Sequence, residues 1–221
     1  MRKTAYTTQR LGMSGFTLLE LLASFAIVGV LTMLVFQGVR SMQAAAEGTR
    51  CIANLRSISQ AVLLYAADHS QKLPSLGTSA TGLYDGIWFR YRDFVSPYLD
   101  LADAKKKKLF TCGSDAEFSK LTLPSYVFSG GNEYKPGLLK GVAGAPLASL
   151  RAPSRTLLLL EGSMLFFKSF HEPNPASNVD FRSYVSFVDG HAVALTAWSA
   201  PGVSINAGIN PPESYDYIFG D

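Results

Sequence analysis

One carboxylate stands inside an apolar run near the start of the chain. Glu20 is the only charged residue between Phe16 and Phe36. A carboxylate at membrane depth costs roughly 2.5–3.5 kcal/mol on insertion scales, so a function or a partner is the default explanation for keeping one there. Glu20 is therefore the first candidate functional residue.

A second group with chemical potential is Asp189-Gly190-His191. Aspartate and histidine are both competent metal ligands and acid–base groups. Asp-Gly between two apolar runs is also the strongest short signal for a β-hairpin, and Tyr184–Val188 and His191–Trp198 supply such runs. Turn formation explains the motif without a ligand, and the sequence favours that interpretation.

The remaining polar residues show no pattern that predicts catalysis. The 221 residues contain no nucleophile elbow, phosphate-binding loop or paired histidine ligands. His69 and His171 are expected to stand alone in polar surroundings. We predict no catalytic residue, no cofactor, no metal and no enzymatic activity.

Charge gives no indication of nucleic-acid binding. The formal net charge is +3, but Arg2, Lys3 and Arg10 all lie in the first 15 residues, where no acid balances them. Without those three, 17 basic residues face 17 acidic ones. The run Lys105–Lys108 is the most concentrated basic segment, and we interpret it as a solvated loop.

One long helix and the domain that follows it must position these residues. Residues 16–38 form an apolar segment long enough to cross a bilayer as a helix. Residues 39–68 continue it as an amphipathic helix without proline. Gly29, Gly38 and Gly48 are expected weak points, each costing about 1 kcal/mol relative to alanine. The apolar stripe of the second part comprises Met42, Ala45, Ile52, Leu55, Ile58, Val62 and Tyr65.

Residues 69–221 predict a globular head with an antiparallel sheet. The segments Trp88–Tyr91 and Phe94–Leu99 are interpreted as part of a region of loops and short strands that contributes aromatic core residues. Arg155–Gly162 and Met164–Phe170 predict two further strands, in addition to the hairpin. A sheet of three to five strands laid across the C-terminal half of the long helix gives an α+β fold.

The start of the chain resembles the class III signal of type IV pilins and type II secretion pseudopilins. A basic leader, residues 1–15, ends in a glycine, and the apolar segment follows in Gly15-Phe16-Thr17-Leu18-Leu19-Glu20. A secretory signal has the opposite order, with its cleavage site after the apolar region. The resemblance implies that a prepilin peptidase cuts between Gly15 and Phe16 and methylates Phe16. It also implies that Glu20 meets the N-terminus of a neighbouring subunit during assembly.

The same resemblance implies a pilin-like fold and a structural subunit of a type II secretion pseudopilus or type IV pilus-like filament. Expected partners are the prepilin peptidase, copies of the chain and other pilin-like subunits, and an inner-membrane assembly platform. No nucleic acid is expected. The basic leader predicts a single-pass protein of the inner (cytoplasmic) membrane, with a cytoplasmic N-terminus and a head in the periplasm or outside the cell. The alternative is an exported binding or enzymatic domain that uses a pilin-like signal only as its anchor.

Five further segments of the chain resemble a pseudopilin-like group with a large C-terminal domain. They are Cys51–Arg56, Tyr65–Pro74, Phe110–Cys112, Arg155–Gly162 and Phe187–His191. Two positions depart from that group: Gly113 replaces a common proline, and Val179 replaces a common histidine ten residues before Asp189. His171 is out of register with that histidine, so no role carries over to it. Some pseudopilins hold calcium in C-terminal loops, but the candidate ligands here lack regular spacing; they are Asp180, Asp189, Asp216 and Asp221.

Cys51 and Cys112 are the only cysteines of the chain. An exported domain lies in an oxidising compartment, and two cysteines there favour a disulfide between them. A bond that closes a loop with about 60 residues between its ends contributes about 4 kcal/mol through chain entropy, and often less in practice. The alternative is two unlinked cysteines in the core.

Overall fold

The computed structural model describes residues 17–77, 86–115, 117–166, 168–171, 180–199 and 208–220; within the first helix it leaves out the side chains of residues 37, 38, 40 and 41. The chain divides into two compact units, Met1–Gln43 and Ala44–Asp221. Several positions singled out from the sequence lie outside the described residues. They are the leader 1–15 with Gly15, Phe16, Val179 and Asp221.

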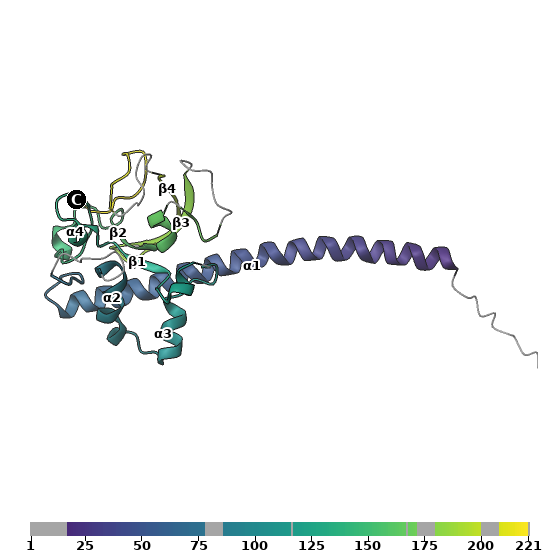
Figure 1. The fold of residues 1–221 in the computed structure, drawn as a ribbon, viewed down its shortest axis with the longest axis horizontal. Coiled ribbons are helices and arrows are strands. Elements are labelled where there is room, and N and C mark those ends of the chain that lie inside the picture. The colour runs from purple at the N-terminus through teal and green to yellow at the C-terminus, as the bar shows by residue number, and fades with distance from the viewer. Residues whose placement is uncertain are drawn as a thin grey trace, which may run out of the picture. The chain divides into compact units, whose positions relative to one another are not determined.

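Helix α1 spans Leu18–Asp68, which confirms the expectation of one long helix (Figure 1). From Leu18 to Phe36 its large apolar side chains are exposed. By length and apolar composition this stretch is the one candidate membrane span among the described residues. The chain therefore carries, near its N-terminus, a helix that is long and apolar enough to cross a membrane.

Within the second unit, α1 buries a stripe of apolar side chains. The predicted stripe is confirmed at Leu55, Ile58 and Val62, which recur at the spacing of one helix face and are fully buried. Its first two members, Met42 and Ala45, are exposed, so that part of the prediction is wrong. Among the side-chain positions of α1 that the structure describes, the first buried one is Gly48, and Met42 belongs to the other compact unit.

Four strands form one antiparallel sheet in the order β1-β2-β3-β4. The strands are β1 (Tyr126–Phe128), β2 (Leu157–Glu161), β3 (Phe181–Phe187) and β4 (Ala192–Ala197). Strand β2 confirms the strand predicted over Arg155–Gly162, whereas β1 was not predicted. The combination of helices with this sheet confirms the α+β class.

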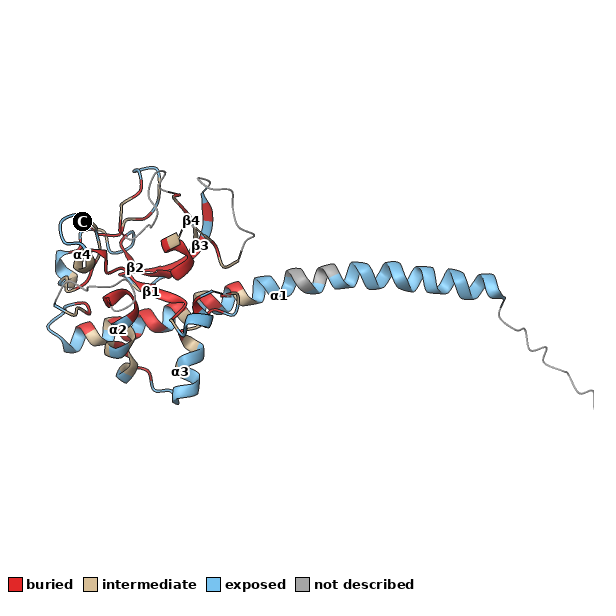
Figure 2. Cartoon of the chain, in the orientation of Figure 1, coloured by how far each residue is buried: buried red, intermediate tan, exposed pale blue. Residues whose placement is uncertain are grey.

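The sheet packs on the second part of α1. The buried Ser59 hydroxyl of α1 donates to Ser186 Oγ of β3 at 2.7 Å, and Arg56 donates to the carbonyl of Ala192 in β4 at 3.4 Å. Figure 2 shows buried residues in red on both the sheet and this part of α1. The core of the second unit therefore lies between these two layers.

Strands β3 and β4 form the predicted hairpin around Asp189-Gly190. The Phe187 N–H donates to the carbonyl of His191 at 3.0 Å, and the Gly190 N–H donates to that of Phe187 at 2.9 Å. Gly190 has a φ of 89°, a left-handed conformation that glycine adopts without steric cost. Turn geometry therefore accounts for the Asp-Gly pair.

The strand predicted over Met164–Phe170 is wrong, because the chain forms a 3₁₀ helix over Gly162–Phe166. A Cβ at Gly162 would lie 2.9 Å from the ring of Phe118, and the Gly162 N–H donates to the carbonyl of Ser125 at 2.8 Å. These contacts fix the turn at the end of β2. A short apolar run fits a strand and a buried helical segment equally well, so its sequence does not separate the two.

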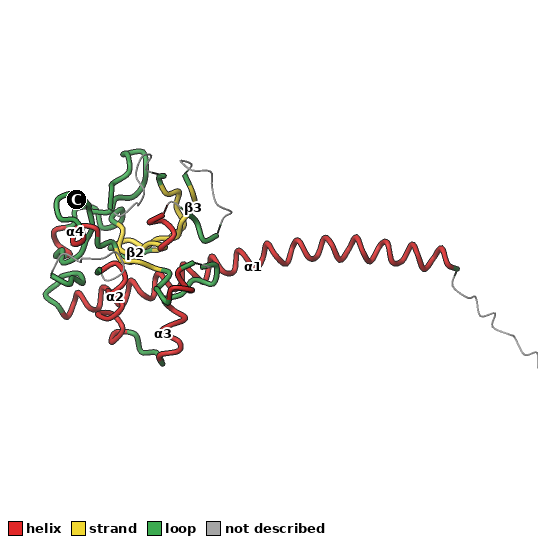
Figure 3. The backbone as a smooth tube through the Cα atoms, in the orientation of Figure 1, coloured by secondary structure: helices red, strands yellow, loops and turns green. Residues whose placement is uncertain are grey.

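The remaining helices occupy segments that the sequence suggested were loops and short strands (Figure 3). Helix α2 (Ile87–Val95) is amphipathic and packs on β1, where the Tyr91 hydroxyl donates to the carbonyl of Tyr126 at 3.0 Å. Helix α3 (Asp103–Leu109) contains Lys105–Lys108, so the predicted solvated loop is a mostly exposed helix. Further short helices are α4 (Gly131–Tyr134) and 3₁₀ turns over Ser96–Tyr98, Phe118–Leu121 and Leu147–Ser149.

Candidate functional site

Glu20 closes a capping box at the start of α1. The N–H and the hydroxyl of Thr17 both donate to Glu20 Oε2 at 2.9 Å, and the Glu20 N–H donates to Thr17 Oγ1 at 3.2 Å. This reciprocal pattern is the Thr-x-x-Glu signature of a helix N-terminus. Glu20 therefore has a local structural role that the sequence interpretation missed, although the spacing of Thr17 and Glu20 signals it.

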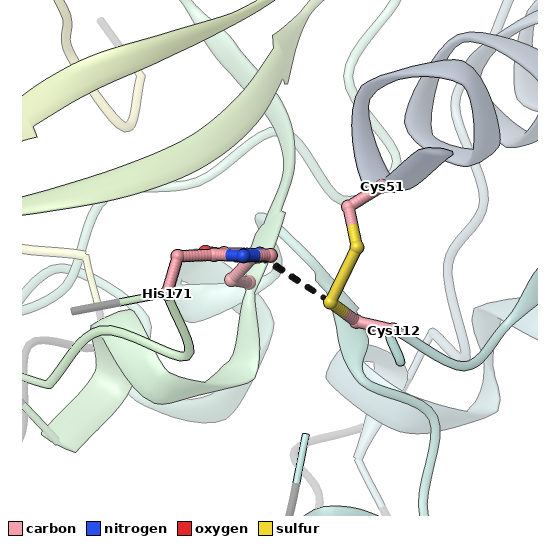
Figure 4. Close-up of side chains that lie close together, drawn as sticks. Cys51, Cys112 and His171 are labelled. Atoms are coloured by element: carbon pink, nitrogen blue, oxygen red, sulfur yellow. Dashed lines mark hydrogen bonds and ion pairs between the residues drawn. A yellow bond between two sulfur atoms is a disulfide. The ribbon is translucent and has the colours of Figure 1, made fainter. Parts of the chain in front are cut away.

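Cys51 and Cys112 are joined by a disulfide, with their Cα atoms 5.6 Å apart (Figure 4). Cys51 lies on α1 and Cys112 in the loop after α3, and both are fully buried. The Cys112 N–H donates to Ser125 Oγ at 2.9 Å, and Ser125 donates to Asp115 at 2.6 Å. The bond therefore links the helix to a loop that hydrogen bonds hold in place.

A glutamate and a histidine lie beside this disulfide. Nε2 of His171 lies 2.9 Å from Oε1 of Glu161 and 3.4 Å from Sγ of Cys112. The Glu161 side chain is fully buried and that of His171 is 8% exposed. Figure 4 shows the His171 ring directed at the sulfur. The prediction that His171 stands alone in polar surroundings is wrong, because the loop after the 3₁₀ helix brings it to the end of β2.

Neighbouring groups hold the Glu161–His171 pair in position. Oε2 of Glu161 accepts the N–H of Tyr184 at 3.1 Å and the hydroxyl of Ser183 at 3.4 Å. The His171 N–H donates to Ser169 Oγ at 3.1 Å, and its ring meets the ring of Tyr184 edge to face. A buried carboxylate is tolerated only when it is paired and hydrogen-bonded, and Glu161 meets that requirement.

A surface hollow of about 320 Å³ reaches His171 from outside. His171 and Tyr184 line it from the sheet side, and Gly48 lines it from α1. A Cβ at Gly48 would overlap the Tyr184 hydroxyl, so glycine at this point lets the helix and the tyrosine approach closely. The hollow gives a small ion or a water molecule access to the imidazole.

Four potential ligand atoms gather here, and the two sulfur atoms among them can bind a metal only as thiolates, after reduction of the disulfide. One atom each from Cys51, Cys112, Glu161 and His171 lies within 4.8 Å of the others. Within this set, Oε1 of Glu161 and Nε2 of His171 lie at hydrogen-bond distance from each other. The sequence analysis missed Glu161, whose signal is a charge directly after the buried run Leu157–Leu160.

The other candidates from the sequence lie apart from this cluster. Nδ1 of His191 contacts Oδ1 of Asp189 at 2.6 Å, but both side chains are exposed on the hairpin turn. Asp180 accepts hydrogen bonds from the Ser199 N–H and from the Tyr215 hydroxyl. Within the part of the chain that the structure describes, the calcium candidates Asp180, Asp189 and Asp216 are not among the ligand atoms gathered in a metal-binding group.

His69 also has a partner. Its ring stacks on that of Tyr65 with 3.8 Å between centroids, and its Nδ1 lies 2.8 Å from the Tyr65 carbonyl oxygen. The expectation that it stands alone is wrong, because a histidine four residues after a tyrosine lies on the same face of the helix end.

The geometry therefore offers two places of interest, the capped start of an exposed apolar helix and a buried Glu–His pair beside two sulfur atoms. Comparison with protein-family models, with curated proteins and with solved structures finds no match to this chain.

Proposed function

We propose that this protein is a structural subunit of a pilin-like filament, either a type II secretion pseudopilus or a type IV pilus-like fibre. Its leader is removed by a prepilin peptidase, its apolar helix is rooted in the inner membrane, and its head lies on the far side. The subunits assemble by packing their apolar helices against one another, and this assembly takes place on an inner-membrane platform. Head-to-tail assembly of this kind produces an open helical fibre.

The observation that carries the proposal is the exposed apolar surface of α1 with a carboxylate at its start. The residues from Leu18 to Phe36 need a lipid or protein environment, because so long an apolar surface is not stable in water. A bilayer covers it in the single subunit, and neighbouring helices cover it in a filament. Glu20 is the one charge on it, and its position five residues after Gly15 supports a role in register between subunits.

The first test is the N-terminus of the protein purified from membranes of cells that contain a prepilin peptidase. We expect intact mass and peptide sequencing to give a mature chain that begins at N-methylated Phe16. Gly15→Val is expected to block cleavage, whereas Gly12→Val, a glycine in the same leader, leaves it intact. A wild-type chain that keeps Met1 would contradict the proposal and favour the anchored-domain alternative.

A second test separates the charge of Glu20 from its role in the capping box. Glu20→Gln keeps a side chain that can close the box, because glutamine serves in this position, but removes the negative charge. We expect the variant to remain inserted and processed while co-purification of two differently tagged copies falls at least about tenfold, as loss of a charge-assisted contact predicts.

Ser24→Ala is the matched control for this change. Ser24 lies four residues further along α1 and donates only to the carbonyl of Glu20, at 2.7 Å. Assembly of this variant should match wild type. Assembly of Glu20→Gln at the wild-type level would show that capping, and not charge, is the reason for Glu20.

A further inference from the structure

We propose that reduction of the Cys51–Cys112 disulfide creates a zinc site formed by Cys51, Cys112, Glu161 and His171. One position then has two alternative states, a disulfide or a zinc ion held by two thiolates, a carboxylate and an imidazole. This inference does not depend on the filament proposal, since all four residues belong to the unit Ala44–Asp221.

The distances between the ligand atoms carry the argument. Oε1 of Glu161, Nε2 of His171 and Sγ of Cys112 are separated by 2.9, 3.4 and 3.9 Å. In a tetrahedral zinc site with bonds of about 2.0–2.3 Å, ligand atoms lie roughly 3.3–3.8 Å apart. Sγ of Cys51 completes the set within 4.8 Å of the other atoms. The two sulfur atoms, about 2.0 Å apart in a disulfide, must also separate to roughly 3.8 Å once the bond is broken, while Glu161 and His171 need only small side-chain movements to meet the ion.

The types of ligand favour zinc over other metals. Two thiolates select against magnesium and calcium, which prefer oxygen, and imidazole with carboxylate suits zinc better than monovalent copper. Four protein ligands leave no open position, as in structural zinc sites. The site proposed here therefore stabilises the fold and has no catalytic role.

The surroundings supply the outer contacts that such ligands require. Oε2 of Glu161 is held by Tyr184 and Ser183, which leaves Oε1 directed toward His171 and Cys112. Orienting contacts of this kind are typical of metal sites. The hollow lined by Gly48, His171 and Tyr184 opens on one of the four ligands, the His171 imidazole.

The two states interconvert by thiol–disulfide exchange. In the reducing direction, two molecules of a small-molecule thiol supply the two electrons that break the Cys51–Cys112 bond; they join as a disulfide and release two protons to solvent, and the two thiolates formed bind the zinc ion. With a small-molecule disulfide as oxidant, each of the two thiolates loses one electron and the bond between Cys51 and Cys112 forms. The S–S bond of the oxidant breaks, two protons from solvent convert its halves into thiols, and the zinc ion is released. The redox poise of the compartment therefore selects the state.

The test uses the full chain in detergent, reduced with a phosphine and desalted without oxygen. Cobalt(II) is the probe, because tetrahedral thiolate coordination gives it an intense visible spectrum and a sulfur-to-metal band. We expect one cobalt ion per reduced chain, displacement by zinc, and no binding to the oxidised chain. Glu161→Gln and His171→Gln should each weaken binding by more than about tenfold.

The exposed pair on the hairpin provides matched controls. Asp189→Asn and His191→Gln remove a carboxylate and an imidazole that also contact each other, and these changes should leave cobalt binding unchanged. No binding to reduced wild type would overturn the proposal. Equal binding by wild type and by the Glu161 and His171 variants would also overturn it, since the thiolates would then act alone.

Thermal unfolding keeps the proposal testable if a variant does not fold. Zinc should raise the unfolding temperature of reduced wild type, or fold the chain outright if it is unfolded without metal, because binding free energy becomes folding free energy. An unchanged unfolding temperature with zinc, or a reduced chain that stays unfolded with it, would overturn the proposal.

Discussion

Gly48 illustrates how a single residue joins the helix to the candidate site. The sequence marks it only as a weak point in a long helix. In the structure it is buried, and the Tyr184 hydroxyl lies where its side chain would be. Tyr184 in turn packs on His171 and donates its N–H to Glu161. The absence of a side chain at residue 48 thus helps to position the Glu161–His171 pair through Tyr184.

We expect Gly48→Ala to lower the free energy of unfolding, by up to about 2 kcal/mol, because an overpacking cost of about 1–3 kcal/mol is offset in part by the gain of about 1 kcal/mol from alanine in a helix. Urea denaturation in detergent, followed by tryptophan fluorescence, measures the change. In a Tyr184→Phe background the cost should shrink, because the nearest atom to the new methyl group is the hydroxyl oxygen.

Gly29→Ala is the helical control for this substitution. Apart from its chain neighbours and the backbone of α1, no atom of the described residues lies within 4 Å of a Cβ added at Gly29, so the free energy of unfolding should not fall. A Gly48→Ala protein as stable as wild type would mean that Tyr184 moves freely, contrary to its contacts with His171.

At the scale of elements, the contact between α1 and β3 includes a buried pair of hydroxyls. Ser59 and Ser186 are fully buried and 2.7 Å apart. We expect Ser59→Ala to cost about 1–3 kcal/mol, because it removes the hydrogen-bond partner of a buried hydroxyl. The double variant Ser59→Ala/Ser186→Ala should be more stable than that single variant, because both polar groups are then gone.

Ser57→Ala is the matched control, since Ser57 is exposed on α1 and donates to the carbonyl of Ala53. Its urea midpoint should stay close to wild type. If Ser59→Ala and Ser57→Ala have equal midpoints, the hydrogen bond between helix and sheet contributes nothing to stability.

The elements also show what the sequence can predict. The long helix follows from sustained apolar periodicity without proline, β2 from a run of leucines ended by glycine, and the hairpin from Asp-Gly between apolar runs. Helix α2 was missed because its many aromatic residues suggest strands, whereas packing on β1 selects a helix. The 3₁₀ helix at Gly162–Phe166 depends on a contact with Phe118, which lies far away in the sequence.

The candidate site was predictable only in part. The two cysteines stand out by residue type, and Glu20 stands out as a lone charge in an apolar run. The pairing of Glu161 with His171 does not, because ten residues and a change of direction separate them. Only the fold brings the imidazole to the end of β2, so residue types and spacing alone give no indication of this contact.

At the scale of the whole molecule, buried phenols predict how stability depends on pH. Burial raises the pKa of Tyr91 and Tyr217 far above their ordinary value. The hydrogen bond to Asp180 raises the pKa of Tyr215 to about 12. The folded chain therefore holds these protons more tightly than the unfolded chain, whose tyrosines ionise near pH 10. The contribution of these tyrosines to the free energy of unfolding is fully present below about pH 10 and is lost as the pH rises above that value.

We therefore expect the urea midpoint to fall as the pH rises above about 10, together with late ionisation of the buried tyrosines in ultraviolet absorbance. Tyr215→Phe should reduce the pH dependence of the urea midpoint only slightly, because the Tyr215 ring lies near the surface, where solvent screens its interaction with Asp180. Ionisation of all ten tyrosines near pH 10 in the folded protein would contradict the expectation.

The disulfide also determines how the molecule bears tension. A pull between the first turns of α1 and the last residues of the chain passes through covalent bonds from residue 51 directly to residue 112. The intervening segment, with a sequence separation of 61 between the two cysteines, carries none of that force while the bond is intact. Helices α2 and α3 lie within this sheltered loop. Breaking the bond would add roughly 200 Å of chain to the covalent path that transmits the force, at about 3.3–3.6 Å per residue.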